Sequence, residues 1–134
     1  MIYEQRLTIP KLTTQDYPEV SVMVVHPGIV RKVSIEFPPG CCGLAHLQIW
    51  YWGRCIWPSS PNTDFASDTH PLDFGESIEI IDPPYEFWIV GWNEDDSYDH
   101  TPRVRIEITA PETSIEDVLV SMFGAPVSPS VEEE

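Results

Sequence analysis

A chain of 134 residues with 42% hydrophobic residues is long enough to bury the core of one globular domain. Its 22 acidic residues outnumber 7 basic ones and give a formal net charge of −15. This balance argues against nucleic acid and anionic membranes as partners, because both are bound through lysine and arginine. The sequence contains no run of 18 apolar residues, so it predicts no transmembrane helix. Its N-terminus lacks the basic start and apolar core of a signal peptide.

The first third of the chain contains three predicted β-strands. Residues 3–9 and 29–37 alternate apolar and polar side chains with the period of a strand, and residues 19–26 are assigned by their content of β-branched residues. Proline and glycine separate them, because proline donates no backbone hydrogen bond and glycine accepts positive φ. Only Pro27 and Gly28 divide the second segment from the third, so the two form either a hairpin or one strand with a corner.

Residues 44–57 are rich in β-branched and aromatic side chains but are too long for one typical strand. We expect Gly53 to mark a bulge or bend within them. Two faces can be assigned by alternation. The expected core face consists of Ala45, Leu47, Ile49 and Tyr51, and the expected surface face of His46, Gln48, Trp50 and Trp52.

The next segments alternate between loops and strands. Residues 58–75 predict a long loop, and residues 76–81 a short strand. Residues 85–92 are apolar almost throughout and predict a central strand covered on both faces. An acidic loop at 93–102 precedes a clearly alternating strand at 103–109.

The pattern then changes to that of an amphipathic helix at residues 114–123, with a capping signature at Thr113 and Glu116 and with Gly124 placed to end it. Its apolar stripe consists of Ile115, Val118, Leu119, Met122 and Phe123. Because a helix of this length is marginal alone, we expect the stripe to dock on the domain, a neighbouring subunit or a larger assembly.

Together these elements predict an all-β fold, an antiparallel β-sandwich followed by one short C-terminal helix. A jelly roll is the first choice of topology and an immunoglobulin-like sandwich the second. The expected organisation is a sandwich domain at 1–110, a helical extension at 111–124 and a disordered acidic tail at 125–134.

The densest cluster of possible metal ligands is in the acidic loop, at Asp95, Asp96 and Asp99. The spacing imitates the start of a calcium loop, but His100 stands where glycine is required and Ile106 where the twelfth-position glutamate belongs. We therefore interpret the loop as a solvated acidic loop, with calcium binding as the alternative.

No other pattern in the sequence indicates chemistry. Zinc-ligand spacings, a nucleophile elbow and a phosphate-binding loop are absent from the sequence, so we assign no catalytic residue and expect neither enzymatic activity nor a cofactor. The odd number of cysteines, 3, favours reduced thiols. Of the 5 tryptophans, Trp57 and Trp88 are expected in the core, and Trp50 and Trp52 at an interface or on a sugar-binding platform.

One series of segments resembles a known class of proteins. It runs from HPGIVRKVSIEFPPGCCGLAHLQIW through RCIWP and a long loop to FWIVGWNEDDSYDHTPRVRIEIT, over roughly residues 26–109. This order is similar to that of small jelly-roll accessory proteins of tailed-phage virions, of the decoration or head-associated type. The resemblance implies a non-enzymatic structural protein that binds a capsid lattice or forms a symmetric oligomer, and it identifies no functional residue.

Our leading hypothesis is therefore a virion structural protein acting through protein–protein interfaces, with a homo-oligomer or the major capsid protein lattice as partner. Its interface residues would be the two tryptophans Trp50 and Trp52 and the stripe of the C-terminal helix. The alternative is a carbohydrate-binding β-sandwich module that uses exposed tryptophans. The expected location is the virion, or the cytoplasm if the chain is not a phage protein.

Overall fold

The computed structural model describes residues 1–60 and 62–110, and every regular element within them is a β-strand. The predicted C-terminal helix and acidic tail lie outside the described residues. In chain order the strands are β1 (Ile2–Arg6), β2 (Glu19–Val24), β3 (Gly28–Glu36), β4 (Ala45–Tyr51), β5 (Arg54–Trp57), β6 (Leu72–Ile80), β7 (Glu86–Asn93) and β8 (Arg103–Thr109).

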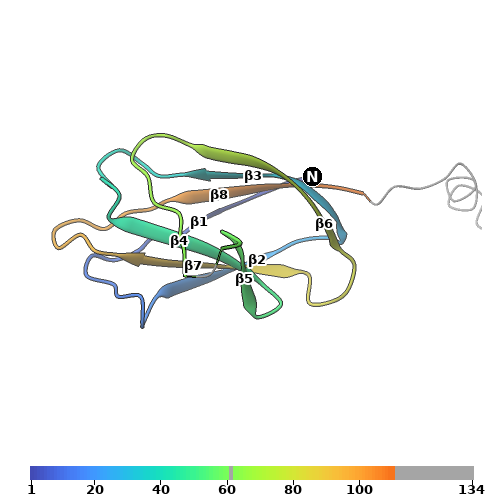
Figure 1. Ribbon diagram of the computed structural model, residues 1–134, viewed down its shortest axis with the longest axis horizontal. Coiled ribbons are helices and arrows are strands. Elements are labelled where there is room, and N and C mark those ends of the chain that lie inside the picture. Colours follow the sequence, from blue (N-terminus) through green and yellow to red (C-terminus); the bar gives the residue numbers. More distant parts are fainter. Residues whose placement is uncertain (61, 111–134) are drawn as a thin grey trace, which may run out of the picture.

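The strands form two four-stranded antiparallel sheets, and Figure 1 shows how they run. One sheet has the order β1-β8-β3-β6 and the other β2-β7-β4-β5. Each of the first four strands pairs with one of the last four, taken in reverse order: β1 with β8, β2 with β7, β3 with β6 and β4 with β5. Consecutive strands β2 and β3 belong to different sheets, so the break at Pro27 is a corner rather than a hairpin. The predicted all-β architecture is confirmed.

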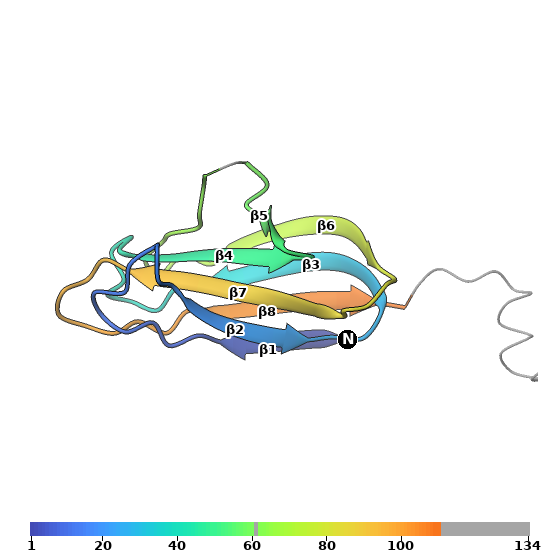
Figure 2. The same ribbon diagram turned by 90° about the horizontal axis from the view of Figure 1, so that it is seen from below.

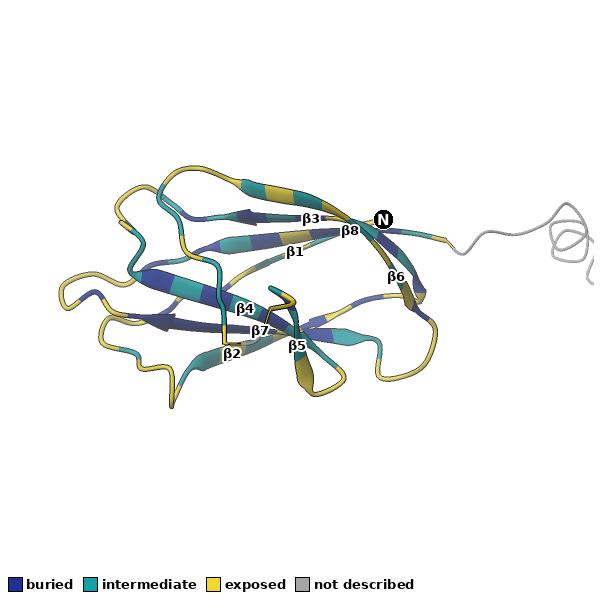
Figure 3. Ribbon diagram, viewed as in Figure 1, coloured by how far each residue is buried: buried dark blue, intermediate teal, exposed yellow. Residues whose placement is uncertain are grey.

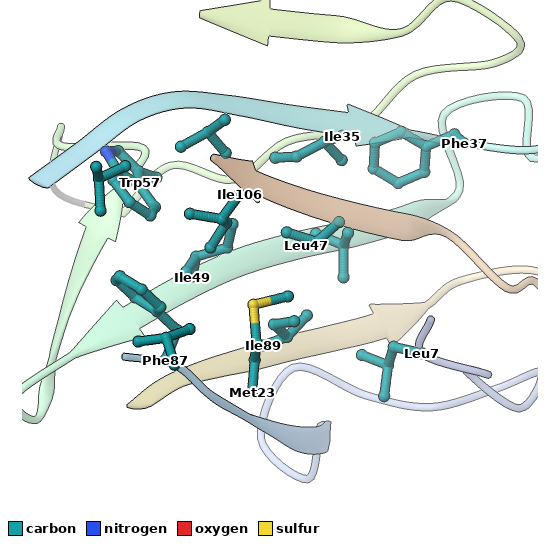
Figure 4. Close-up of a cluster of buried hydrophobic side chains, with 14 of the residues drawn as sticks. Leu7, Met23, Ile35, Phe37, Leu47, Ile49, Trp57, Phe87, Ile89 and Ile106 are labelled. Carbon is teal, nitrogen blue, oxygen red and sulfur yellow. The ribbon is translucent and has the colours of Figure 1, made fainter. Parts of the chain in front are cut away.

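The two sheets face each other across one hydrophobic core, as Figure 2 shows for the layers and Figure 4 for the side chains. The core consists of alternate residues of the strands, since every second side chain points to the same face. On β4, Ala45, Leu47 and Ile49 are fully buried, as predicted. From the opposite sheet, β8 contributes Ile106 and Ile108. Burial of each such side chain contributes about 1.5–3 kcal/mol relative to exposure.

The predicted bulge or bend within one strand at Gly53 is wrong, because this glycine belongs to the tight hairpin turn that joins two strands, β4 and β5. Trp52 and Gly53 form its two-residue turn, with φ angles of 54° and 76°. Two successive positive φ values characterise the turn whose twist matches that of the flanking strands. The register irregularity lies instead between Ile49 and Trp50, which face Trp57 and Cys55.

The predicted loop at 58–75 is shorter in the structure, because β6 begins at Leu72 rather than at residue 76. Phe74, which we placed in the loop, lies in this strand, and its ring centroid is 5.7 Å from that of Phe65. The backbones of Phe65 and Leu47 exchange two hydrogen bonds, of 2.8 and 2.9 Å. The remaining loop is thereby attached along the edge of β4, ahead of the residues that pair with β5.

Candidate functional site

The outer faces of the two sheets differ in chemistry, and this difference locates the candidate site. The sheet β1-β8-β3-β6 has a charged outer face, and its strands contain five of the chain's seven basic residues, Arg6, Arg31, Lys32, Arg103 and Arg105. Carboxylates lie among them. Arg105 donates to Glu4 Oε1 at 2.8 Å, and Arg103 binds Glu36. The Arg105 guanidinium lowers the pKa of Glu4 below its ordinary value.

The outer face of the other sheet is apolar along β2. Val20, Val22 and Val24 are 50%, 44% and 71% exposed, whereas Met23, which points the other way, is buried. Figure 3 shows the same alternation of exposed and covered positions along the strands. A strand that carries only valines on its solvent side differs from an ordinary surface strand, whose outward residues are polar.

The apolar character continues across the sheet through two tryptophans. In the strand register Trp88 of β7 lies opposite Val22 on one side and opposite Trp50 of β4 on the other. Trp88 is 45% exposed and Trp50 is half-buried. Each indole N–H is directed at a neighbour on its own strand: Trp50 Nε1 donates to Gln48 Oε1 at 3.1 Å, and Trp88 Nε1 lies 3.5 Å from Glu86 Oε1.

We call this surface the valine–tryptophan face, defined as Val20, Val22, Val24, Trp50 and Trp88. Because the two indole N–H groups are occupied within the sheet, the face offers a partner mainly apolar area. Glu86 borders it on the same face of β7, and Glu19 precedes the valines at the start of β2.

A polar cluster closes the opposite end of the same outer surface. There the ring of His46 stacks on that of Trp92, with centroids 5.2 Å apart and an interplanar angle of 11°. His46 Nδ1 is hydrogen-bonded to Asp64 Oδ1 at 2.6 Å, while Nε2 lies 2.6 Å from Glu94 Oε2 without hydrogen-bond geometry. Trp92 is only 5% exposed, so the open apolar surface ends before this cluster.

The two tryptophans predicted at an interface are separated by the turn geometry. Trp50 lies in β4 and belongs to the valine–tryptophan face, whereas Trp52 is in the β4–β5 turn and is 57% exposed. The five residues of the predicted C-terminal stripe lie outside the described residues.

The prediction of Trp88 as a core residue is wrong, whereas that of Trp57 is confirmed. The strand itself is central, between β2 and β4, and Val90 and Trp92 on its outer face are covered, as predicted. Trp57 is 2% exposed, stacks on Phe87 with ring centroids 5.4 Å apart, and donates from Nε1 to Glu76 at 2.9 Å. Trp88 lies one position along β7 from the buried Phe87 and therefore points outward.

Sequence reasoning also missed Val20, Val22 and Val24, which were seen only as good strand formers. The available signal was the uniformity of β2, whose sequence EVSVMV has no charged residue after Glu19; it marks an unusual strand but does not tell whether the second apolar face is covered. A half-exposed strand normally shows polar residues at every second position.

The acidic loop is organised by the hydrogen bonds of one carboxylate, that of Asp95. Asp95 Oδ1 accepts from the backbone N–H groups of Ser97 and Tyr98 at 2.8 and 3.3 Å, and its Oδ2 is 2.8 Å from His100 Nε2. These contacts, first the Ser97 N–H and then His100, lower the pKa of Asp95 below its ordinary value.

The other two calcium candidates have separate partners. Asp99 accepts from the Lys11 N–H at 2.9 Å, and Asp96 accepts from the Ser97 hydroxyl at 2.9 Å. Among residues 1–60 and 62–110 no three His, Cys, Asp or Glu side chains are grouped so that they could hold a metal ion. All three cysteines are free thiols.

A cleft of about 670 Å³ opens beside the charged sheet. Its walls combine Arg6, Arg103, Glu36 and Asp99 with Phe37 and two prolines. The buried His100 borders it, but that imidazole is already bonded to Asp95. Among the residues that line the cleft, no hydrogen bond joins His100 to the hydroxyl of Thr69 or Thr101.

No helix in the described part of the chain is long and apolar enough to cross a membrane. No protein-family model matches the chain, and a search of curated proteins finds no relative.

Proposed function

We propose that the two sheets form a jelly roll and that the protein is a non-enzymatic structural component of a phage virion, of the capsid decoration or head-associated type. A jelly roll can be described as one long antiparallel hairpin of four strand pairs that has rolled up into two sheets. The pairs β1·β8, β2·β7, β3·β6 and β4·β5 support this topology, and the β3·β8 and β4·β7 pairings would close the roll.

One observation carries the functional part of the proposal: the valine–tryptophan face is an exposed apolar surface on an otherwise acidic protein. Contiguous apolar patches on soluble domains mark interaction sites, and partly exposed tryptophans provide much of the binding energy at protein interfaces. The resemblance of residues 26–109 to virion accessory proteins is consistent with this role. Its partner would be the major capsid protein lattice, further copies of the chain, or both.

The charges around the face indicate what the capsid surface should offer. Glu19 and Glu86 flank the apolar residues, and the whole chain carries a net charge of −15. A complementary surface would be apolar at its centre and basic at its rim, because like charges across an interface oppose association. Binding should therefore weaken as ionic strength rises, since salt screens the charges at the rim.

The test is cosedimentation of the purified full chain with assembled capsids of the phage that encodes it. We expect saturable binding, and Trp88→Ser should weaken it by roughly thirtyfold, the size of a 2 kcal/mol hot spot. Tyr98→Ser is the matched control, because Tyr98 is 71% exposed but lies in the acidic loop. Absence of binding by the full chain, or equal losses for both variants, would overturn the proposal.

The second candidate function is carbohydrate binding, and it is favoured by the position of Trp50 directly opposite Trp88 on an outer face. Tryptophan rings side by side can stack on sugar rings, and Gln48 and Glu86 beside them could bind hydroxyl groups. Titration with soluble polysaccharides should then shift the tryptophan fluorescence in the wild type and not in Trp88→Ser. If no polysaccharide shifts the emission, this function is excluded.

A further inference from the structure

Strand β2 is an edge strand whose free side can be assigned from hydrogen bonds. Among the described residues it pairs with β7 alone, and the Val25 N–H, in the same register, donates to the Tyr85 carbonyl at 2.9 Å. In an antiparallel ladder, hydrogen-bonded and non-hydrogen-bonded pairs alternate. Residues 19, 21 and 23 therefore bond to β7, and the backbone N–H and C=O groups of Val20, Val22 and Val24 point to the open edge.

This edge lacks the features that keep edge strands from pairing. Natural edges are protected by charged side chains, proline, bulges or short length. The other three edge strands show such protection: β5 has 4 residues, β1 carries Glu4 and Arg6, and β6 carries Asp73 and Glu79. By contrast β2 has 6 residues in unbroken register, with neither proline nor lysine and with Glu19 only at its start.

We propose that β2 pairs with β2 of a second copy of this chain, antiparallel and centred on Val22, across a two-fold axis. Val22 then faces Val22 of the partner subunit, and Val20 faces Val24 of the partner subunit. In this register, each residue whose backbone N–H and C=O groups point to the open edge lies opposite such a residue of the second copy. Every open N–H can therefore donate to a carbonyl across the two-fold axis. The result is one continuous sheet with the order β5-β4-β7-β2 joined to the same four strands in reverse.

The self-complementary register points to a second copy as the occupant of this edge, and the charge on the strand does not prevent the pairing. The register is self-complementary, as a two-fold interface requires. Glu19 would face Val25 of the partner subunit, and the two Glu19 side chains would be six residue positions apart, roughly 20 Å along the strands. That separation is beyond the Debye length of about 8 Å in physiological salt, so their repulsion is screened.

The expected dimer is weak in isolation, because six residues per subunit bury less than the roughly 1,200 Å² at the lower limit of stable interfaces. It would strengthen in an assembly that holds many copies close together. This inference rests on the proposed function in one respect: the surface proposed to bind the capsid would be formed by the valine–tryptophan faces of both subunits together.

The test uses single cysteines in a background in which Cys42→Ser and Cys55→Ser remove the accessible native thiols. Dibromobimane, a short reagent that fluoresces only after joining two thiols, is added to the full chain. Val22→Cys should cross-link at least ten times faster than Val20→Cys or Val24→Cys alone. In each of these two variants the cysteines of the two subunits lie four residue positions apart along the strands, roughly 14 Å. A mixture of the Val20→Cys and Val24→Cys proteins should cross-link as Val22→Cys does.

Sedimentation of the protein with its native cysteines gives a second, independent measurement. The dimer fraction should rise with protein concentration, and Val22→Pro should abolish this rise, because proline removes an N–H that the monomer does not use. The matched control Val22→Thr keeps both the N–H and the β-branched shape and should still dimerise. Circular dichroism confirms that each variant is folded.

Equal cross-linking by all three single cysteines, or a monomer at every concentration, would overturn the self-pairing. The proposed function would stand in that case if Trp88→Ser still weakened capsid binding. Conversely, dimerisation with no capsid binding would leave the self-pairing intact and overturn only the virion role.

Discussion

Gly91 of β7 is a position at which one added carbon would collide with side chains of the hydrophobic core. A Cβ built on this glycine would lie 2.6 Å from Cδ1 of Ile9 and 3.0 Å from a Cδ2 atom of each of Leu7 and Leu47. These side chains are themselves buried, with Ile9 and Leu47 fully enclosed. The core around Gly91 therefore leaves no room for a side chain, whereas its backbone conformation does not require glycine.

Two opposing contributions decide the magnitude of the effect of Gly91→Ala. Replacing glycine by alanine in a strand normally stabilises the fold by about 0.5–1 kcal/mol, because the unfolded chain becomes less flexible. Overpacking a filled core costs about 1–3 kcal/mol. We expect a net loss of about 1–2 kcal/mol, or about 4–8 °C in melting temperature for a domain of this size.

The assay is urea unfolding followed by tryptophan fluorescence, with Gly75→Ala as the matched control. At Gly75, also in a strand, the nearest atom to an added Cβ is the Arg31 carbonyl oxygen at an ordinary 3.8 Å. This variant should be neutral or slightly more stable. If both variants lose the same stability, the cost arises from the strand backbone and the packing argument is refuted.

A double-mutant cycle sharpens the test, because Ile9→Val removes the Cδ1 atom that the new Cβ meets. Alone, Ile9→Val should lower the free energy of unfolding by about 0.5–1.5 kcal/mol, because the removed methyl group leaves a cavity. In the Gly91→Ala background the same change should cost less or restore stability, since the two side chains share one space. Simple additivity of the two losses would contradict the proposed contact.

Two further predictions concern titratable groups. Burial raises the pKa of the Cys41 thiol to about 11, so at pH 8 iodoacetamide should modify the exposed Cys42 in the folded protein and leave Cys41 unmodified, as read by peptide mass spectrometry; equal labelling would contradict it. Because the folded pKa of Asp95 is lowered, its charge stabilises the fold above the unfolded value of about 3.9 and stops doing so as pH falls through the folded value. The wild type should therefore exceed Asp95→Asn in free energy of unfolding at pH 7, and the difference should shrink below pH 4; a constant difference would exclude the charge as its cause.

The sequence by itself determined which side chains of several strands face the core. Alternation assigned Ala45, Leu47 and Ile49 to the inside of β4, and it predicted β8 with its observed bounds. The physical reason is local: successive side chains of a strand point to opposite faces. Where one face contacts water and the other the core, polar and apolar residues therefore alternate in the sequence. Strong turn residues between the strands made the all-β class predictable in the same way.

The organisation of the acidic loop could not be derived from the loop's own residues. A row of carboxylates is typical of both a cation site and a solvated turn, and only the folded backbone brings the N–H groups of Ser97 and Tyr98 to Asp95. Likewise, the sequence around Gly53 allows either a bulge or a hairpin, and pairing of β4 with β5 decides between them.

Tertiary structure alone decided which apolar positions remain in contact with water. Val22 and Trp88 lie in segments whose composition is equally suited to a buried strand, so their local sequence could not distinguish a covered face from an open one. The difference appears only in the fold: Val22 and Trp88 remain 44% and 45% exposed, whereas Val90 and Trp92 on the same face are 8% and 5% exposed. Exposure of a side chain is set by strands and loops distant in the sequence, and alternation within one strand carries no information about them.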